Sequence, residues 1–286
     1  MFELTILNQL HRFDLGENAF GCSPSVHDFI LGLSDRDLSQ YLSSYPETAA
    51  TLKCRISELA AMLRSGEIDV ANCSIFEGLQ QPGLALVPNI SISADGAVKS
   101  VRLFSKVPLV DMRTVALDTS SLTSTALTRI LLKESFGVTP EYHHHAPDLS
   151  AMLAQFDAGL IIGDLKLFDL EPNTIVYDLG QGWKDLTGMP FVYAGWLARE
   201  DRASAEMIRL LTAAKAWGVE HLEPLAVKWA AAMNLPPDRC RDYFFNVMNY
   251  GLNDRQLDGL RLFQQKCVEH RLVSDLLPIT MARGCS

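Results

Sequence analysis

The sequence has no long apolar run and a deficit of basic charge. None of its hydrophobic stretches approaches the roughly 20 residues that a membrane-spanning helix requires. Acidic side chains outnumber basic ones by 34 to 25, and the net charge of −9 argues against a nucleic-acid partner. The N-terminus lacks the basic and apolar regions of a signal peptide. We therefore expect a cytoplasmic protein without a membrane partner.

Paired cysteines are missing, and so are the common nucleotide-binding and nucleophile motifs. The 6 cysteines include no Cys-x-x-Cys pair, so we expect free thiols in a reducing compartment. No Walker loop, G-x-G-x-x-G fingerprint or G-x-S-x-G elbow occurs. Three adjacent histidines, His143, His144 and His145, cannot all face one metal from a strand or helix, so we expect a solvated loop there. The sequence therefore predicts neither a metal nor a cofactor.

Strand and helix patterns alternate through the middle of the chain. Short apolar runs predict strands, and apolar residues at helical spacing lie between them. The expected elements are strands at 98–104, 114–117, 159–163 and 174–178, with helices at 124–135 and 148–156. Beyond residue 196 the pattern is almost wholly helical. This alternation favours an α/β fold with parallel sheets.

Two long extended runs, 98–104 and 190–196, bracket a compact α/β segment. We interpret them as paired crossovers between two lobes with a cleft between the lobes. The first lobe is then discontinuous and comprises residues 1–97 and 197–286, with a helical C-terminal part. The second lobe, residues 98–196, is inserted between these two parts. At 286 residues the chain is long enough for two such lobes.

A hydroxyl-rich turn joins the strand at 114–117 to the following helix. Its side chains are Ser120, Ser121, Thr123 and Ser124. The start of a helix offers unpaired backbone N–H groups and the positive end of the helix dipole, and hydroxyls add further donors. The turn is thus a candidate receptor for a carboxylate or phosphate. The alternative is that these residues only cap the helix, for which one hydroxyl is enough.

Asp164 follows the apolar strand at 159–163, as Asp118 follows the strand before it. The carboxyl ends of strands in open α/β sheets face the ligand crevice, which makes Asp164 a candidate catalytic group. The alternative is a structural turn or helix cap, a common role for aspartate.

Five segments, at residues 95–106, 115–124, 162–164, 177–180 and 187–196, occur in the order seen in one enzyme family. Together they resemble the chorismate dehydratases of the futalosine route to menaquinone. The resemblance is dense from about residue 57 to residue 196 and looser in the helices that follow.

This resemblance implies a two-lobed fold like that of type II periplasmic binding proteins, with a double crossover hinge. It implies a lyase that dehydrates chorismate to 3-[(1-carboxyvinyl)oxy]benzoate without a cofactor or metal, as a monomer or homodimer. The hydroxyl turn, with Ser74 and Gly163, would bind the substrate. Asn8 and Asp164 would be the catalytic residues, although a carboxylate of the substrate is an alternative base.

Two other functions fit the same pattern. A sister family makes 1,4-dihydroxy-6-naphthoate on this fold, but it carries His-Glu where this chain has Gly163 and Asp164. The second alternative is a non-catalytic binding protein for a small aromatic or enolpyruvyl carboxylate. This chain also departs from the dehydratase pattern, with Ser74 in place of a proline and Leu122 in place of an arginine, and only residues 6–8 fit the usual N-terminal motif.

Overall fold

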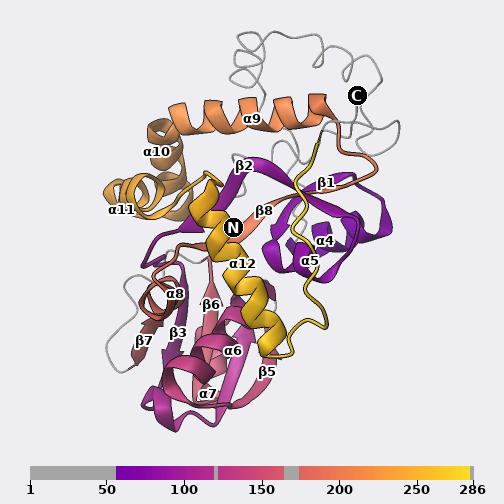
Figure 1. Ribbon diagram of the computed structural model, residues 1–286. Helices are drawn as coiled ribbons and strands as arrows, with labels where there is room; N and C mark the ends of the chain where they lie inside the picture. The colour runs from indigo at the N-terminus through magenta and orange to yellow at the C-terminus, as the bar shows by residue number, and fades with distance from the viewer. Residues whose placement is uncertain (1–55, 119–121, 164–173, 284–286) are drawn as a thin grey trace.

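The computed structural model describes residues 56–118, 122–163 and 174–283, which form two β-sheets flanked by helices (Figure 1). The predicted site residues Asn8, Ser120, Ser121 and Asp164 lie outside this described part. Among the described residues, no helix combines the length and the apolar character needed to cross a membrane.

The first sheet is antiparallel, with strand order β1-β8-β2. Every residue of β1 is buried because helices cover both faces of the sheet. Val70 and Trp196 pack with α9 on one face, and Ala71 and Cys73 pack with α4 and α5 on the other. The elements are β1 (Val70–Ser74), β2 (Leu84–Ala94), β8 (Phe191–Arg199), α4 (Ile56–Ser65), α5 (Ile75–Gln80) and α9 (Ala205–Glu220).

The second sheet has five strands in the order β5-β4-β6-β3-β7. β4 runs parallel to β5 and β6, whereas β3 is antiparallel to β6 and β7. Met152 of α7 packs with Phe104 and Ala116 on one face, and Leu127 of α6 packs with Leu103 on the other. The elements are β3 (Val101–Ser105), β4 (Thr114–Asp118), β5 (Glu141–His145), β6 (Ala158–Ile162), β7 (Ile175–Asp178), α6 (Leu122–Phe136), α7 (Leu149–Gln155) and α8 (Leu179–Thr187).

The chain passes between the two sheets at two places. The first crossover, residues 95–100, leads from β2 to β3, and the second, residues 188–190, leads from α8 back to β8. The carboxylate of Asp178 accepts the backbone N–H groups of Val98 at 3.0 Å and Lys99 at 2.7 Å. The same carboxylate caps the start of α8. The first crossover is therefore tied to the second sheet.

The C-terminal quarter of the described chain is helical. α10 (Leu222–Met233) and α11 (Pro237–Asp242) follow α9, and a π-helical turn covers Tyr243–Val247. The last helix, α12 (Asp254–Glu269), begins with a capping box between Asn253 and Gln256. In Figure 1, α12 runs diagonally across the molecule from the first sheet towards α6.

The predicted elements of the second sheet agree with the structure to within three residues at each end. The strand orientation was predicted wrongly in part: the alternating pattern favours parallel sheets, but all pairs of the first sheet are antiparallel, and so are the pairs of β3 with β6 and β7. Antiparallel pairing follows from β2 leaving that sheet and β8 returning to it. Residues 191–196 accordingly pair with β1 and β2, whereas the sequence assigned them to the second lobe.

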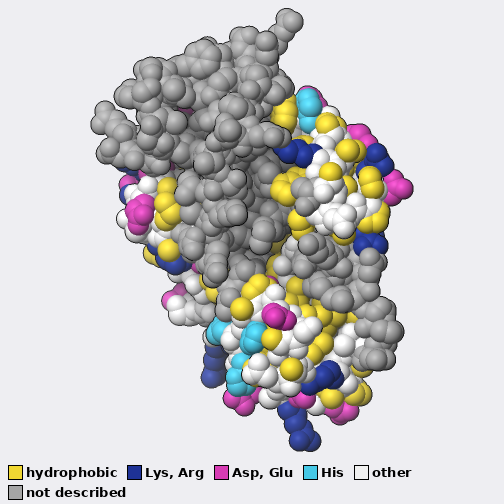
Figure 2. All heavy atoms as spheres, turned by 180° about the vertical axis from the view of Figure 1, so that it is seen from behind, with side chains coloured by type: hydrophobic (Ala, Val, Ile, Leu, Met, Phe, Trp, Pro, Cys, Tyr) yellow, Lys and Arg dark blue, Asp and Glu magenta, His cyan; other side chains and the backbone are white. Residues whose placement is uncertain are grey.

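The histidine triplet is not a loop. Residues 143, 144 and 145 lie in β5, the edge strand that pairs in parallel with β4. His143 stacks on Phe156 with ring centroids 4.8 Å apart, and this aromatic contact supports the strand. Figure 2 shows a group of histidine side chains on the surface of the half of the molecule that holds this sheet. Within the described ranges, no three His, Cys, Asp or Glu side chains are grouped as a metal would require.

Candidate functional site

The start of α6 meets the end of β1, and two hydroxyl side chains make the contact. The Oγ of Ser74 accepts the backbone N–H of Thr123 at 3.1 Å, and the hydroxyl oxygens of Ser74 and Thr123 lie 2.5 Å apart. In return, the Oγ1 of Thr123 accepts the backbone N–H of Phe76 at 3.3 Å. Each hydroxyl thus accepts a backbone N–H from the segment that carries the other.

This hydroxyl pair is buried, with Ser74 7% exposed and Thr123 fully buried. Buried donors need partners, and here each segment supplies one for the other. Because Ser74 ends a strand of the first sheet and Thr123 begins a helix of the second, the contact joins the two halves of the fold. Among the predicted substrate-binding residues, the structure brings these two together.

The first turn of α6 carries hydroxyls and no charge. Thr123 and Ser124 are buried, whereas Leu122 is exposed. The Ser124 carbonyl accepts the hydroxyl of Thr128 at 2.8 Å, one turn further along the helix. No acidic side chain in this turn neutralises the positive end of the helix dipole. The start of a helix without acidic side chains favours an anion, and hydroxyl groups donate hydrogen bonds without exchanging protons at neutral pH.

Gly163 lies at the end of β6, against the first crossover. Its backbone N–H donates to the carbonyl of Ser100 at 2.7 Å, and its φ of 72° is in the left-handed region that glycine tolerates best. The hydroxyl of Ser100 is in turn 2.7 Å from that of Tyr243. The structure therefore places Gly163 beside the first crossover.

Two ionisable side chains near these segments have shifted pKa values. Burial raises the pKa of the Cys73 thiol, and the neighbouring Glu77 carboxylate raises it further. Cys73 is therefore a neutral packing residue and not a nucleophile. Burial also lowers the pKa of the Arg102 guanidinium on β3, and the charge of Asp178 opposes that shift.

The sequence did not predict the hydrogen bonds between the Asp178 carboxylate and the backbone of the first crossover. An aspartate directly before a helix is a common N-cap signal, and Asp178 does cap α8 through the N–H of Gln181. Its second role needs residues 98 and 99, some eighty positions away, to lie against it. Sequence spacing alone cannot reveal such a contact.

Comparison with known proteins gives a family match over most of the chain. The model of a family described as menaquinone biosynthesis matches residues 22–269. A chorismate dehydratase from Thermus thermophilus is 32% identical over 228 residues, which cover 73% of this chain and 83% of that protein.

Solved structures with the same fold include binding proteins. Protein AF1704 from Archaeoglobus fulgidus matches with a TM-score of 0.64 at 18% identity, over 84% of this chain and 95% of that one. The alkanesulfonate-binding protein of Xanthomonas axonopodis pv. citri matches at 0.58 and 16%, over 89% and 92% of the two chains. The aliphatic sulphonate binding protein of Escherichia coli matches at 0.55 and 17%, over 78% and 82%. These likenesses show a mixed α/β fold of the periplasmic-binding-protein type.

Proposed function

The chain belongs to the menaquinone biosynthesis family, and we propose that it is a chorismate dehydratase. This enzyme is a hydro-lyase that converts chorismate to 3-[(1-carboxyvinyl)oxy]benzoate and water. The observation that carries the proposal is the 32% identity to a chorismate dehydratase over 73% of this chain. The family match over residues 22–269 supports it.

The reaction removes a ring hydroxyl and a ring hydrogen from chorismate as one molecule of water. The ring becomes aromatic, and this supplies the driving force, so the elimination requires no redox change. The protein must hold two carboxylates, accept or relay one proton and stabilise the departing hydroxide. These are tasks for hydrogen-bond donors and a base in a site shielded from water.

The first turn of α6 is our proposed receptor for one substrate carboxylate. Its backbone N–H groups, with the hydroxyls of Thr123 and Ser124, are donors at the positive end of a helix dipole. The second observation in support is that the N–H of Thr123 already binds an oxygen from outside its own helix, that of Ser74. That N–H is therefore occupied, and we propose that the carboxylate binds beside the Ser74 oxygen, at the remaining N–H groups of this helix start.

The remaining site residues are proposals from the family resemblance. Ser120 and Ser121 would add donors to the carboxylate receptor, and Gly163 would lie at the edge of the substrate site. Asn8 would orient the substrate, and Asp164 would take part in proton transfer.

The setting of the reaction is proposed as well. The futalosine route to menaquinone and a cytoplasmic location agree with the family and with the acidic composition. We propose that the substrate lies between two lobes and that the inserted lobe falls within residues 98–196. The five-stranded sheet lies within that range, in support of this proposal.

The test is to incubate the purified protein with chorismate in metal-free buffer and to measure 3-[(1-carboxyvinyl)oxy]benzoate by liquid chromatography. We expect stoichiometric conversion that added divalent cations do not accelerate. If chorismate raises the melting temperature and no product forms, the proposed activity is wrong and the protein is a binding protein. The absence of both effects would exclude chorismate as its ligand.

A further inference from the structure

One face of α12 contacts every segment that connects the two sheets. The residues on this face are Arg255, Gly259, Phe263, Lys266 and His270, with His270 directly after the last helical turn. Their spacings of four, four, three and four residues place them in one row along the helix. Their partners come from both crossovers, from the core between the sheets and from α6.

The first turn of α12 binds both crossovers. The guanidinium of Arg255 pairs with the Asp95 carboxylate of the first crossover at 3.1 Å, and it donates to the Gly188 carbonyl of the second at 3.3 Å. At Gly259, an added Cβ would collide with the carbonyl oxygen of Pro190. The second crossover therefore lies directly on the backbone of α12.

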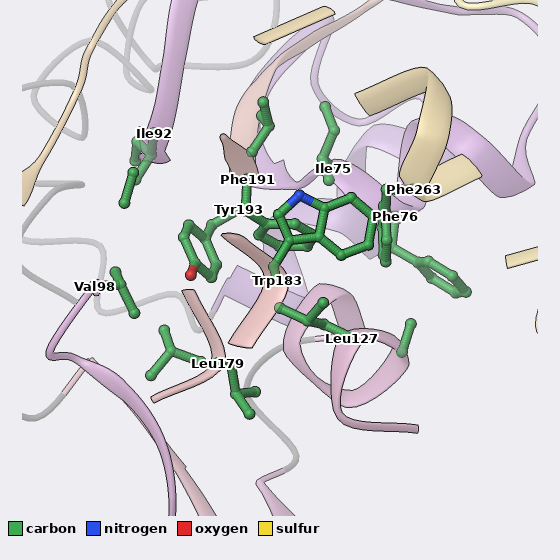
Figure 3. Close-up of a cluster of buried hydrophobic side chains, with 14 of the residues drawn as sticks. Ile75, Phe76, Ile92, Val98, Leu127, Leu179, Trp183, Phe191, Tyr193 and Phe263 are labelled. Carbon is green, nitrogen blue, oxygen red and sulfur yellow. The ribbon is translucent and has the colours of Figure 1, made fainter. Parts of the chain in front are cut away.

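The middle of the row enters an aromatic cluster, which Figure 3 shows among the buried side chains. The ring of Phe263 lies 4.9 Å from that of Phe191 on β8 and 6.0 Å from that of Trp183 on α8. Phe76 of α5 lies 6.5 Å away. Phe263 thus packs at once on both sides of the second crossover, with the first sheet and with a helix of the second.

The end of the row pairs with α6. One oxygen of Glu134 accepts from the ammonium of Lys266 at 2.6 Å, and the other lies 2.8 Å from the Nε2 of His270. The three side chains are only 15–23% exposed, so water screens this cluster less than it screens a surface pair. Both carboxylate oxygens are engaged, which fixes the carboxylate in two directions.

Glu134 and Thr123 lie on the same helix. They are eleven residues apart, a distance of about 16 Å along the axis. An α-helix of this length moves as a rigid body, so the position of Glu134 constrains the direction of the first turn. A constraint on α6 at Glu134 is therefore a constraint on the contact between Thr123 and Ser74.

We infer that α12 is a strut that holds the two sheets in the arrangement needed for substrate binding, and that Glu134, Lys266 and His270 are its releasable end. Glu134 and Lys266 are then positioning residues, acting through α6. This inference rests on the proposed function for its kinetic readout. Opening of the two halves would break the ionic cluster while the crossovers stay bound to the first turn of α12.

The kinetic test compares Glu134→Gln with the wild-type protein and with the charge-reversed pair Glu134→Lys, Lys266→Glu. Loss of the ion pair lowers the fraction of protein in the binding-competent arrangement, which raises the apparent KM and leaves kcat unchanged. For Glu134→Gln we expect KM for chorismate to rise roughly fivefold. The charge-reversed pair should recover most of this loss, while Glu134→Lys alone should be worse than Glu134→Gln.

The matched control is Asp258→Asn, on the same helix. Asp258 pairs with Arg261 at 2.7 Å, but both side chains are more than half exposed and neither belongs to the row that contacts α6. This variant should keep the wild-type KM. If Glu134→Gln lowers kcat with no change in KM, or if the charge-reversed pair recovers nothing, the strut is not releasable and the inference is wrong.

A distance measurement keeps the inference testable without turnover. Spin labels at Val110→Cys, beside α6, and Val219→Cys, on α9, would report the separation of the two halves, since α9 packs on the first sheet and both positions are exposed. Cys22, Cys54 and Cys285 would be replaced by serine, and Cys73, Cys240 and Cys267 are buried. We expect a broader distance distribution for Glu134→Gln than for the wild type or Asp258→Asn. If the distance distribution of Glu134→Gln equals that of the wild type, the inference is wrong. If the distribution broadens but the wild type does not convert chorismate, only the proposed function is wrong.

Discussion

Ser74 and Thr123 exchange hydrogen bonds across the boundary between the two sheets, with their hydroxyl oxygens 2.5 Å apart. The pair is the point at which a strand of one sheet and a helix of the other satisfy each other's polar groups. The neighbouring donors of the same helix start are the ones we propose for a substrate carboxylate. Folding and the proposed binding therefore depend on the position of the same helix start.

The first prediction concerns Ser74→Ala. The substitution leaves the buried N–H of Thr123 without its acceptor, so we expect the free energy of unfolding to fall by about 1–3 kcal/mol. Because it also disturbs the proposed carboxylate receptor, kcat/KM for chorismate should fall at least tenfold. Urea denaturation and steady-state kinetics measure the two effects.

Thr128→Val is the control for this prediction. It removes a buried hydroxyl of α6 that binds within the helix, at the Ser124 carbonyl, and does not touch β1. Its kcat/KM should stay near that of the wild type. A double-mutant cycle between Ser74→Ala and Thr123→Val should show coupling, since their partners are shared. Additive effects would mean that the two hydroxyls do not act together.

Local patterns predicted four of the five strands of the second sheet, and helices α6 and α7, but not the strand β5. The strand expected at 114–117 is β4, Thr114–Asp118, and the helix expected at 124–135 is α6, Leu122–Phe136. Apolar periodicity reports which side chains a single element buries. It says nothing about which distant strand lies alongside, and so the antiparallel first sheet and the position of β8 were missed.

The candidate site was predictable only in part for the same reason. Hydroxyls at a helix start are visible in the sequence, and the contact between Ser74 and Thr123 requires the folded chain. The histidine triplet was predicted as a loop but forms a strand, because a polar strand at the edge of a sheet lacks the apolar alternation from which strands are predicted. The row on α12 has helical spacing, but its partners at residues 95, 134 and 188 are far away in sequence.

The second prediction concerns Asp164, which stays a candidate from sequence alone. Asp164→Asn removes the carboxylate and keeps the size of the side chain, so a role in proton transfer predicts a fall in kcat of about 10²–10⁴-fold. The measurement is kcat at saturating chorismate. Asp148→Asn, which changes the cap of α7, is the control and should keep kcat. Full activity of Asp164→Asn would remove this residue from the mechanism.

The third prediction concerns the pH dependence of the Glu134 cluster. Burial raises the pKa of Glu134, but the hydrogen bonds and charges of Lys266 and His270 lower it more, so the net pKa lies below the ordinary value of 4.5. A carboxylate with a depressed pKa stabilises the folded state above its unfolded pKa, and this stabilisation is lost as the pH falls through the folded pKa. The wild type should therefore be more stable than Glu134→Gln at pH 5.5, and the difference should shrink towards pH 3.

Urea denaturation of both proteins across this pH range measures the difference in unfolding free energy. Asp258→Asn serves again as the control, because an exposed pair contributes little at any pH. A difference between the wild type and Glu134→Gln that stays constant from pH 5.5 to pH 3 would show that the charge of Glu134 does not stabilise the fold.

The fourth prediction separates helix propensity from packing at Gly259. Alanine in place of glycine stabilises an exposed helix interior by about 1 kcal/mol. At residue 259, however, the added methyl group would strike the carbonyl of Pro190, and overpacking of this kind costs about 1–3 kcal/mol. We expect Gly259→Ala to be destabilised by about 1 kcal/mol net, although its helix propensity improves.

The control is Asp258→Ala, one residue away and exposed. It gains helix propensity without the collision and should be at least as stable as the wild type. If Gly259→Ala is the more stable of the two variants, the second crossover moves away from the added methyl group at little cost. In that case α12 does not hold the crossover in place and cannot act as a strut.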